Sequence, residues 1–194
     1  MTRLLLASLA SVVFAPAVQA ANLFGDPGFD SSLGDWSADA GTAINRTTGD
    51  DFGGNIASGS MEMRTSNGSN GNLVARACLL ATPGNYDFST GVKLVSGDSA
   101  GMQCDAYAST DCSGASLGSA TAEGAASSNW STLTATSFAV PAGSQSVGCV
   151  LTGNQPLRLS APSVPAGFSV AVRFDDVVFQ LSGTPVTLQG FDVQ

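Results

Sequence analysis

Short runs in which apolar and polar residues alternate make up most of this chain, and glycine, proline, asparagine and serine separate these runs. Alternation with a period of two puts successive side chains on opposite faces of a β-strand, so the pattern predicts strands. No stretch keeps apolar residues at helical spacing between capping residues, so we expect almost no helix. Strands are predicted near residues 22–24, 42–47, 59–64, 72–81, 85–95, 101–109, 131–139, 145–152 and 168–180.

The alternation also predicts which side chains face the core. In residues 85–95 one face carries Tyr86, Phe88, Thr90, Val92 and Leu94. The last predicted strand places Asp176 on the same face as its apolar residues, which are Val170, Val172, Phe174 and Val178. A carboxylate on a buried face costs free energy unless it is paired, so Asp176 is expected to have a partner. Many short strands joined by turn residues are typical of an all-β, two-sheet antiparallel β-sandwich.

Residues 1–20 have the features of a secretory signal peptide. Arg3 supplies a positive charge, an apolar stretch runs from Leu4 to Ala17, and Val18-Gln19-Ala20 is a small-x-small cleavage site. The apolar stretch is too short for a membrane span, and no later run approaches the roughly 20 apolar residues that a span needs. We therefore expect a secreted protein, extracellular or periplasmic, with no membrane insertion. One domain is expected over residues 21–182, and residues 183–194 form a C-terminal tail or an edge strand.

The chain is acidic, because 15 Asp and Glu residues face seven Lys and Arg residues, of which Arg3 lies in the predicted leader. Such a surface repels phosphate groups, which argues against nucleic acid and anionic membranes as partners. It is compatible with neutral glycans or with bound cations, and it also keeps an exported protein soluble.

The four cysteines all follow the leader, and an even number of cysteines in an exported chain predicts two disulfides. Three connectivities are possible. We favour Cys104 with Cys112, because the Ser-Thr-Asp turn before Cys112 suits a hairpin, and this leaves Cys78 with Cys149. A zinc site is a weak alternative, since the chain has no CxxC pair and no histidine.

Residues 97–101 read Gly-Asp-Ser-Ala-Gly and fit the GxSxG motif of serine hydrolases. A hydroxyl nucleophile needs a base to take its proton, and the chain has no histidine and lacks the strand-then-helix context of that motif. We interpret these residues as a turn between strands. A glycosidase with paired carboxylates is disfavoured as well, because no aromatic-lined cleft is indicated and the chain is short for that activity. The sequence predicts a protein that is not an enzyme.

Two motifs stand at the two ends of the predicted domain. Residues 22–30 read Asn-Leu-Phe-Gly-Asp-Pro-Gly-Phe-Asp and are followed by Trp36, and residues 172–179 read Val-Arg-Phe-Asp-Asp-Val-Val-Phe. Together they resemble the first and last strands of the jelly-roll carbohydrate-binding modules of the galactose-binding-like superfamily. Between them, Pro83-Gly84-Asn85-Tyr86 and the run that begins at Trp130 resemble further strands of the same modules. Asp26 and Asp30 depart mildly from that family, which usually has Asn and Glu there.

The resemblance implies a jelly roll that binds sugar or anchors the protein, and it implies a structural calcium. In such modules the ion lies between the opening strand and the closing Asp-Asp strand, which correspond here to Asp30 and to Asp175 or Asp176. Calcium takes six to eight oxygen ligands, so a further ligand from the middle of the chain is expected. The candidates are Glu62, Asp50, Asp51 and Asn55, and the alternative is a hydrogen-bonded turn without metal.

Sugar binding in these modules needs an aromatic face and polar side chains. Trp36 and Trp130 match positions that pack in the core, whereas Tyr107 alternates with Cys104 and Ala106 and is expected to face outward. The predicted ligand-binding residues are Tyr107, Asn67, Asn70 and Gln103. We therefore expect a secreted, non-catalytic module that recognises a polysaccharide or a cell-surface glycan. The alternative is an extracellular structural or adhesive sandwich that has lost its sugar site, because exposed aromatic residues are scarce.

Overall fold

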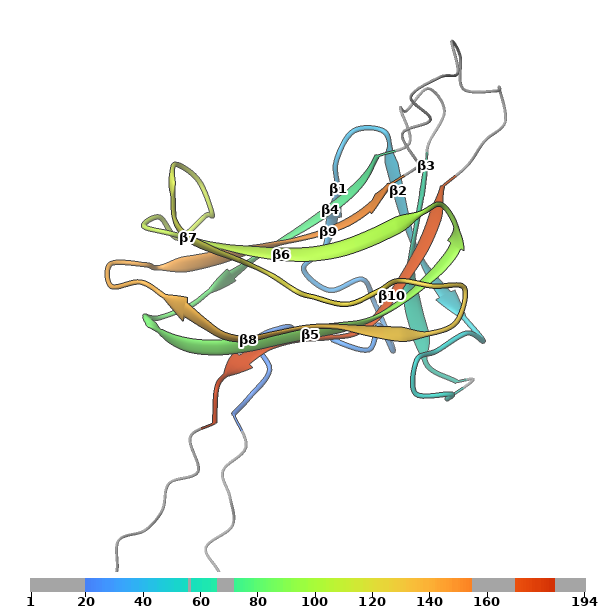
Figure 1. Cartoon of the computed structure of the whole chain (residues 1–194), viewed down its shortest axis with the longest axis horizontal. Helices are drawn as coiled ribbons and strands as arrows, with labels where there is room; N and C mark the ends of the chain where they lie inside the picture. Colours follow the sequence, from blue (N-terminus) through green and yellow to red (C-terminus); the bar gives the residue numbers. More distant parts are fainter. Residues whose placement is uncertain (1–19, 56, 66–71, 155–169, 184–194) are drawn as a thin grey trace, which may run out of the picture.

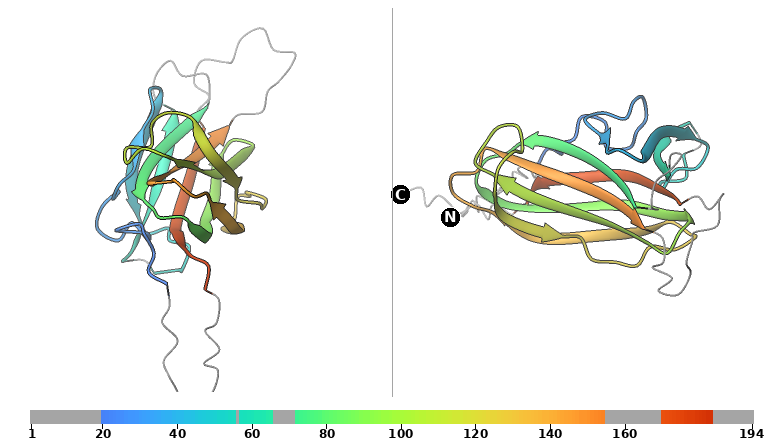
Figure 2. Two further views of the ribbon diagram at one scale, coloured as in Figure 1. Left: turned by 90° about the vertical axis from the view of Figure 1, so that its left-hand side faces the viewer. Right: turned by 90° about the horizontal axis from the view of Figure 1, so that it is seen from above.

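The computed structural model describes residues 20–55, 57–65, 72–154 and 170–183, which fold into two stacked antiparallel sheets (Figures 1 and 2). The first sheet has the strand order β1-β4-β9-β6-β7, with β1 Ser37–Ala38, β4 Leu73–Leu80, β9 Ser146–Asn154, β6 Ser99–Tyr107 and β7 Ser116–Thr121. The second has the order β2-β3-β10-β5-β8, with β2 Thr42–Thr48, β3 Gly59–Thr65, β10 Ala171–Leu181, β5 Gly84–Ser96 and β8 Ser131–Val140. The predicted all-β, two-sheet antiparallel β-sandwich is confirmed. No helix within these ranges has the length and apolar character to cross a membrane.

The strands predicted from residues 42–47 onward are all present, with ends that differ by a few residues. Residues 22–24 do not form a strand, although the Leu23 amide donates to the Phe179 carbonyl at 2.9 Å and so holds this segment beside β10. β1 and β7 were not predicted, because β1 has only two residues and β7 consists mostly of small residues. Gly97 has a φ of +118° and turns the chain from β5 into β6, so the predicted turn over residues 97–101 is confined to residues 97–98, and residues 99–101 belong to β6.

The core lies between the two sheets and is rich in aromatic and aliphatic side chains. Tyr86 and Phe179 stack with ring centroids 4.8 Å apart, and Trp36, 7% exposed, stacks on Phe24 at 5.3 Å. The predicted core position of Trp36 is therefore confirmed. Trp130 is not part of this core: it is half-buried on the outer face of the second sheet, where its indole N–H donates to Asp50. An indole that is partly buried needs a partner for this N–H, and Asp50 supplies it on the outer face.

A β-bulge between Asp175 and Val178 changes which side chains of β10 face the core. Beyond the bulge Val177 and Phe179 are fully buried, whereas Val178 is half-buried and Asp176 is exposed with a φ of +45°. The prediction that Asp176 and Val178 share the buried face is therefore wrong, because the extra residue shifts the alternation by one position. Asp175 takes the buried place instead and is 0% exposed.

Both disulfides lie in the first sheet, and their pairing differs from the favoured prediction. Cys104 of β6 pairs with Cys149, its direct neighbour on β9, and Cys78 of β4 pairs with Cys112 in the loop after β6. The prediction that all four cysteines are oxidised is confirmed, but the favoured pairing of Cys104 with Cys112 is wrong. Cys104 points into the core and Cys112 lies in the loop beside the outer face, so the turn between them does not bring their sulfur atoms together.

Candidate functional site

The outer face of the first sheet carries the side chains that alternate with the core residues of β4, β9 and β6. The strand register places Arg76 beside Val150 and Val150 beside Gln103. Gly148 lies two residues before Val150 on β9 and faces the same side, and it lies beside Asp105 of β6. This face therefore brings together polar side chains that are far apart in the sequence.

Tyr107 is the one aromatic residue in the five strands of this sheet, and it lies on the outer face, as its alternation with the buried Ala106 predicts. Its ring covers Gly148: a Cβ atom at residue 148 would lie 3.1 Å from Tyr107 Cε2 and 3.3 Å from Cys112 Cβ. A side chain at this position would push the ring away, so the glycine allows Tyr107 to lie against the sheet. The ring is half-buried, and part of it stays accessible to a ligand.

Hydrogen-bonding groups lie along the same face of the sheet as this ring. Gln103 Nε2 donates to Asp105 at 3.2 Å and 3.1 Å from its two carboxylate oxygens. Across β9, Arg76 Nε donates to Asp39 Oδ2 at 2.9 Å, and both side chains are exposed. An aromatic surface with a few placed donors and acceptors is the chemistry that fixes a small polar ligand with an apolar face.

The structure places two of the four predicted ligand-binding residues, Tyr107 and Gln103, on the same outer face of β6, four residues apart. Asn67 and Asn70 lie outside the described residues, as do residues 1–19 of the predicted leader and residues 184–194 of the predicted tail. The sequence analysis missed Arg76, Asp105 and Gly148. Alternation within the predicted strands would have placed Arg76 and Asp105 on this face, whereas the role of Gly148 depends on the register between β6 and β9.

A second candidate site is a cluster of carboxylates where the chain bulges in β10. A Cβ atom at Gly28 would lie 3.4 Å from Asp176 Oδ1, 3.6 Å from Asp30 Oδ2 and 3.9 Å from Asp175 Oδ1, so these three carboxylates surround the glycine. Asp51 joins them from the loop before β3, since it acts on the pKa values of both Asp175 and Asp176. The predicted ligands Asp30, Asp175 and Asp176 are thus neighbours.

The electrostatics of this cluster are unfavourable for the bare protein. Burial, together with Asp51 and the charge of Asp176, raises the pKa of Asp175 to about 7, although the amides of Phe52 and Asp176, which each donate to it at 2.8 Å, act in the opposite direction. Burial also raises the pKa of Asp176, as do the charges of Asp51 and Asp30. Carboxylates that repel one another in this way are stabilised by a shared proton or by a cation.

The donor set of this cluster suits calcium, because it offers hard carboxylate oxygens from Asp30, Asp51, Asp175 and Asp176 around a glycine that leaves space. No group of three or more Asp, Glu, His or Cys side chains in the described ranges has the arrangement of a metal centre, so the calcium site stays a prediction. Glu62 is not brought to this cluster and is bonded to Arg64 and Arg173 instead.

The turn that presents Asp30 is organised by Asp26. Its carboxylate accepts hydrogen bonds from the amides of Asp30 at 2.9 Å, Ser31 at 3.0 Å and Ser32 at 2.8 Å. Burial opposes ionisation here, but the hydrogen bonds from Ser31, Ser32 and Asp30 lower the pKa of Asp26 to about 2. An asparagine, usual at this place in the modules that the sequence resembles, offers one acceptor oxygen instead of two.

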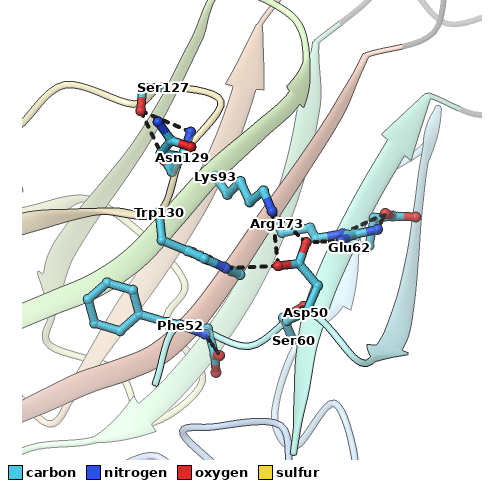
Figure 3. Close-up of polar contacts among 10 residues, drawn as sticks. Asp50, Phe52, Ser60, Glu62, Lys93, Ser127, Asn129, Trp130 and Arg173 are labelled. Atoms are coloured by element: carbon cyan, nitrogen blue, oxygen red, sulfur yellow. Dashed lines mark hydrogen bonds and ion pairs between the residues drawn. The ribbon is translucent and has the colours of Figure 1, made fainter. Parts of the chain in front are cut away.

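An ion-pair network on the outer face of the second sheet holds the loop that carries Asp51 (Figure 3). Asp50 accepts hydrogen bonds from Lys93 Nζ at 2.9 Å and 2.8 Å and from Trp130 Nε1 at 3.0 Å, and it pairs with Arg173. Arg173 also pairs with Glu62 at 2.8 Å. Because Asp50 is fixed on the sheet, the neighbouring Asp51 is directed toward the carboxylate cluster.

The same network contains packed aromatic rings. Phe52 lies on Gly91 of β5, where a Cβ atom would be 2.7 Å from its ring, and it meets Trp130 edge-on with centroids 5.9 Å apart. Burial would raise the pKa of Asp50, but hydrogen bonds from Lys93, Trp130 and Arg173 lower it below the usual value. These polar groups are bonded to one another, so this face serves to hold the loop.

Comparison with known proteins gives structural matches alone, since no family model and no curated protein matches the sequence. The CBM22-2 xylan-binding domain from Paenibacillus barcinonensis Xyn10C is 15% identical, and the match covers 79% of this chain and 96% of that domain with a TM-score of 0.53. The CBM22-1 domain of the same protein is 13% identical, covering 84% and 95%, with a TM-score of 0.56. The chain has the fold of these carbohydrate-binding modules.

A module with a bound ligand is also similar. TmCBM61, solved in complex with β-1,4-galactotriose, is 12% identical, and the match covers 84% of this chain and 100% of TmCBM61 with a TM-score of 0.50. These modules match this chain over most of its length at low sequence identity. The similarity therefore establishes the architecture, and the ligand has to be argued from the side chains of this chain.

Proposed function

We propose that this protein is an exported, non-catalytic module that binds a neutral polysaccharide on the outer face of its first sheet. The observation that carries the proposal is Tyr107, whose ring lies on Gly148 next to the pair of Gln103 and Asp105. The ring offers an apolar surface to the face of a sugar, and the flanking groups accept and donate hydrogen bonds to its hydroxyls. Arg76 extends the polar surface across β9.

Three further observations support the proposal. Similar solved structures are named as xylan-binding domains or contain a galactotriose. The excess of acidic residues favours a neutral glycan over an acidic one. The two disulfides are typical of proteins in oxidising compartments, which agrees with the predicted export.

Calcium is proposed as a structural ion, held by Asp30, Asp51, Asp175 and Asp176. Its chemistry there is charge neutralisation, since it would compensate carboxylates whose pKa values are raised by burial and by one another. The cluster lies in the turns around the β10 bulge, whereas Tyr107 stands on the other sheet. The ion would therefore fix the loops around residues 28–30 and 50–52 without contacting the sugar.

The test is retention of the protein on insoluble xylan, galactan, cellulose and chitin, measured as a bound fraction with calcium and with a chelator. Tyr107→Ala should weaken binding about tenfold or more, which corresponds to a loss of about 1.4 kcal/mol or more. Tyr107→Phe keeps the ring and should retain most binding. Thr132→Ala, an exposed change on β8 of the other sheet, is the matched control. Equal retention of Tyr107→Ala and Thr132→Ala would place the binding surface elsewhere.

A structural or adhesive role is the second candidate, and one observation favours it: Tyr107 is the one aromatic residue in the strands of the first sheet. A single ring gives weak affinity for a single sugar chain. If the wild-type protein is not retained on any polysaccharide, with or without calcium, this second candidate replaces the first.

A further inference from the structure

An apolar groove opens at the end of the sandwich where the described chain both enters and leaves. Its volume is about 590 Å³, and it lies between the N-terminal segment, the end of β10 and the turns that join β4 to β5 and β8 to β9. Figures 1 and 2 show the two ends of the described chain side by side at this end of the molecule. The groove does not include the carboxylate cluster, and its Leu80 shares the outer face of the first sheet with Tyr107, with Ser146 between them.

The groove collects exposed apolar side chains. Five large apolar residues are exposed in the described ranges, and three of them line it: Leu80 at 69%, Leu181 at 47% and Leu23 at 38%. Contiguous apolar surface of this kind usually marks a site that another group covers. The remaining two, Val95 and Leu117, do not line the groove.

A buried hydroxyl in the same groove points to an occupant. Ser144 lines it and is 5% exposed, and its Oγ is the one buried side-chain nitrogen or oxygen atom without a hydrogen-bond partner in the part of the chain that the structure describes. An unpaired buried hydroxyl costs free energy that a partner would recover. The occupant should therefore be mainly apolar and should also carry a hydrogen-bonding group, as a peptide segment does.

We propose that the occupant is the C-terminal segment of this chain, residues 184–194, which folds back into the groove. Its sequence is Thr-Pro-Val-Thr-Leu-Gln-Gly-Phe-Asp-Val-Gln, in which Val186 and Leu188 are spaced so that both point to one side of an extended chain. The segment starts three residues after Leu181, a lining residue, and its length permits a reach of about 36 Å.

The direction in which the chain leaves β10 favours this occupant over a separate molecule. The Ser182 amide donates to the Asn85 carbonyl at 2.8 Å, so the chain runs along the start of β5 toward the β4–β5 turn that lines the groove. A segment attached at the rim has an effective concentration in the millimolar range, which a free partner has to exceed. The tail thus covers the apolar end of the sandwich, and its main chain supplies the partner of Ser144.

Cross-linking tests the proposal directly, because all cysteines of the described ranges are paired and introduced thiols can be followed separately. Leu80→Cys combined with Leu188→Cys should form an intramolecular disulfide under mild oxidation, identified by peptide mass mapping of the monomer. Val95→Cys with Leu188→Cys is the matched control, since Val95 is exposed near the other end of β5, about 36 Å along that strand from Gly84. Equal cross-linking by both pairs, an intermolecular product or no product would overturn the proposal.

Dye binding provides a second readout that does not depend on thiol chemistry. The double change Leu188→Asp and Phe191→Asp should raise the fluorescence of 1-anilinonaphthalene-8-sulfonate at least threefold, because the exposed groove binds the dye. Gln189→Asp with Gln194→Asp adds the same charge to the segment without removing apolar side chains, and it should leave the fluorescence unchanged. Equal fluorescence of the two double variants would show that the segment does not cover the groove.

Discussion

Each of the two sheets of the sandwich is stabilised by a different kind of interaction. The first sheet contains both disulfides and one exposed ion pair, Arg76 with Asp39. The second sheet carries the other four ion pairs of the described ranges, which link Asp50, Glu62, Arg64, Lys93 and Arg173 across its outer face. Covalent links stabilise one layer, and a partly buried charge network stabilises the other.

This difference explains why the two outer faces are suited to different tasks. On the second sheet the charged groups are bonded to one another, and Phe52 and Trp130 cover part of the surface, so the face fixes a loop. On the first sheet one disulfide is buried in the core, and the other, Cys78–Cys112, lies on the outer face beside Gly148. Tyr107, Gln103 and Arg76 remain accessible there, which is what a binding surface requires.

Removal of a disulfide should have the largest effect, and it should be confined to the first sheet. Cys104→Ala with Cys149→Ala opens a loop of 45 residues and should lower the free energy of unfolding by about 4 kcal/mol through gained chain entropy. Cys78→Ala with Cys112→Ala opens 34 residues and should cost slightly less, because Cys78 is exposed and leaves no cavity. Urea denaturation measures both, and a larger loss for the exposed pair would contradict this ranking.

Loss of Arg173 should have the next largest effect. Arg173→Met leaves Glu62, whose side chain is 6% exposed, with Arg64 as its remaining ion-pair partner, and should cost about 3 kcal/mol. Arg76→Met removes an exposed pair on the first sheet and should cost at most about 1 kcal/mol. Thermal unfolding of the two variants compares the sheets directly. Equal losses of stability would show that Arg173 in the network of the second sheet contributes no more than Arg76 in the exposed ion pair of the first.

The carboxylate cluster should make stability depend on pH and on calcium. The pKa of Asp175 is about 7 in the folded state against an ordinary value of 3.8, so the folded state binds more protons between these values. Without calcium, stability contributed by Asp175 should therefore be present below pH 4 and fall as the pH rises toward 7, by an amount of the order of 2 kcal/mol. Calcium should reverse this loss at pH 7.5.

The lowered pKa values of Asp50 and Glu62 make stability rise with pH, which opposes the effect of Asp175. Asp175→Asn removes only the contribution of Asp175 and therefore isolates it. The difference in unfolding free energy between wild type and Asp175→Asn, followed from pH 4 to 8 in chelator, should track the titration of Asp175. A difference that does not change over this range would contradict the raised pKa.

The smallest effect on stability is expected at Gly148. Gly148→Ala places a methyl group 3.1 Å from the Tyr107 ring and 3.3 Å from Cys112 Cβ, and it should lift the ring from the sheet and lower the unfolding free energy by about 0.5–1 kcal/mol. Retention on the polysaccharide that binds wild type should fall severalfold. Thr152→Ala, on the same strand and face, leaves the ring in place and is the control.

The sequence predicts those features that depend on local alternation. The sandwich, the strands from residue 42 onward and the outward position of Tyr107 follow from side-chain periodicity, which any strand imposes. The turn at Gly97 follows from the residue types and the absence of a histidine. These features need no knowledge of which strands are neighbours.

Features that depend on register or on a local irregularity could not be read in this way. The pairing of Cys104 with Cys149 requires that β6 and β9 are neighbours in register, and the alternation along one chain does not reveal which strands are neighbours. The bulge in β10 exchanged the places of Asp175 and Asp176, because one extra residue inverts every later position. Trp130 lies outside the core, where its indole N–H donates to Asp50, a residue that is distant in sequence.

The close spacing of the points where the chain enters and leaves the sandwich has a practical consequence. The Leu23 amide donates to the Phe179 carbonyl at 2.9 Å, so the segments that enter and leave the module lie side by side. Such a unit can be inserted into a surface loop of another protein, or circularly permuted, without separating its sheets. Fusion partners at either terminus would share one pole of the molecule and leave the outer faces of both sheets unobstructed.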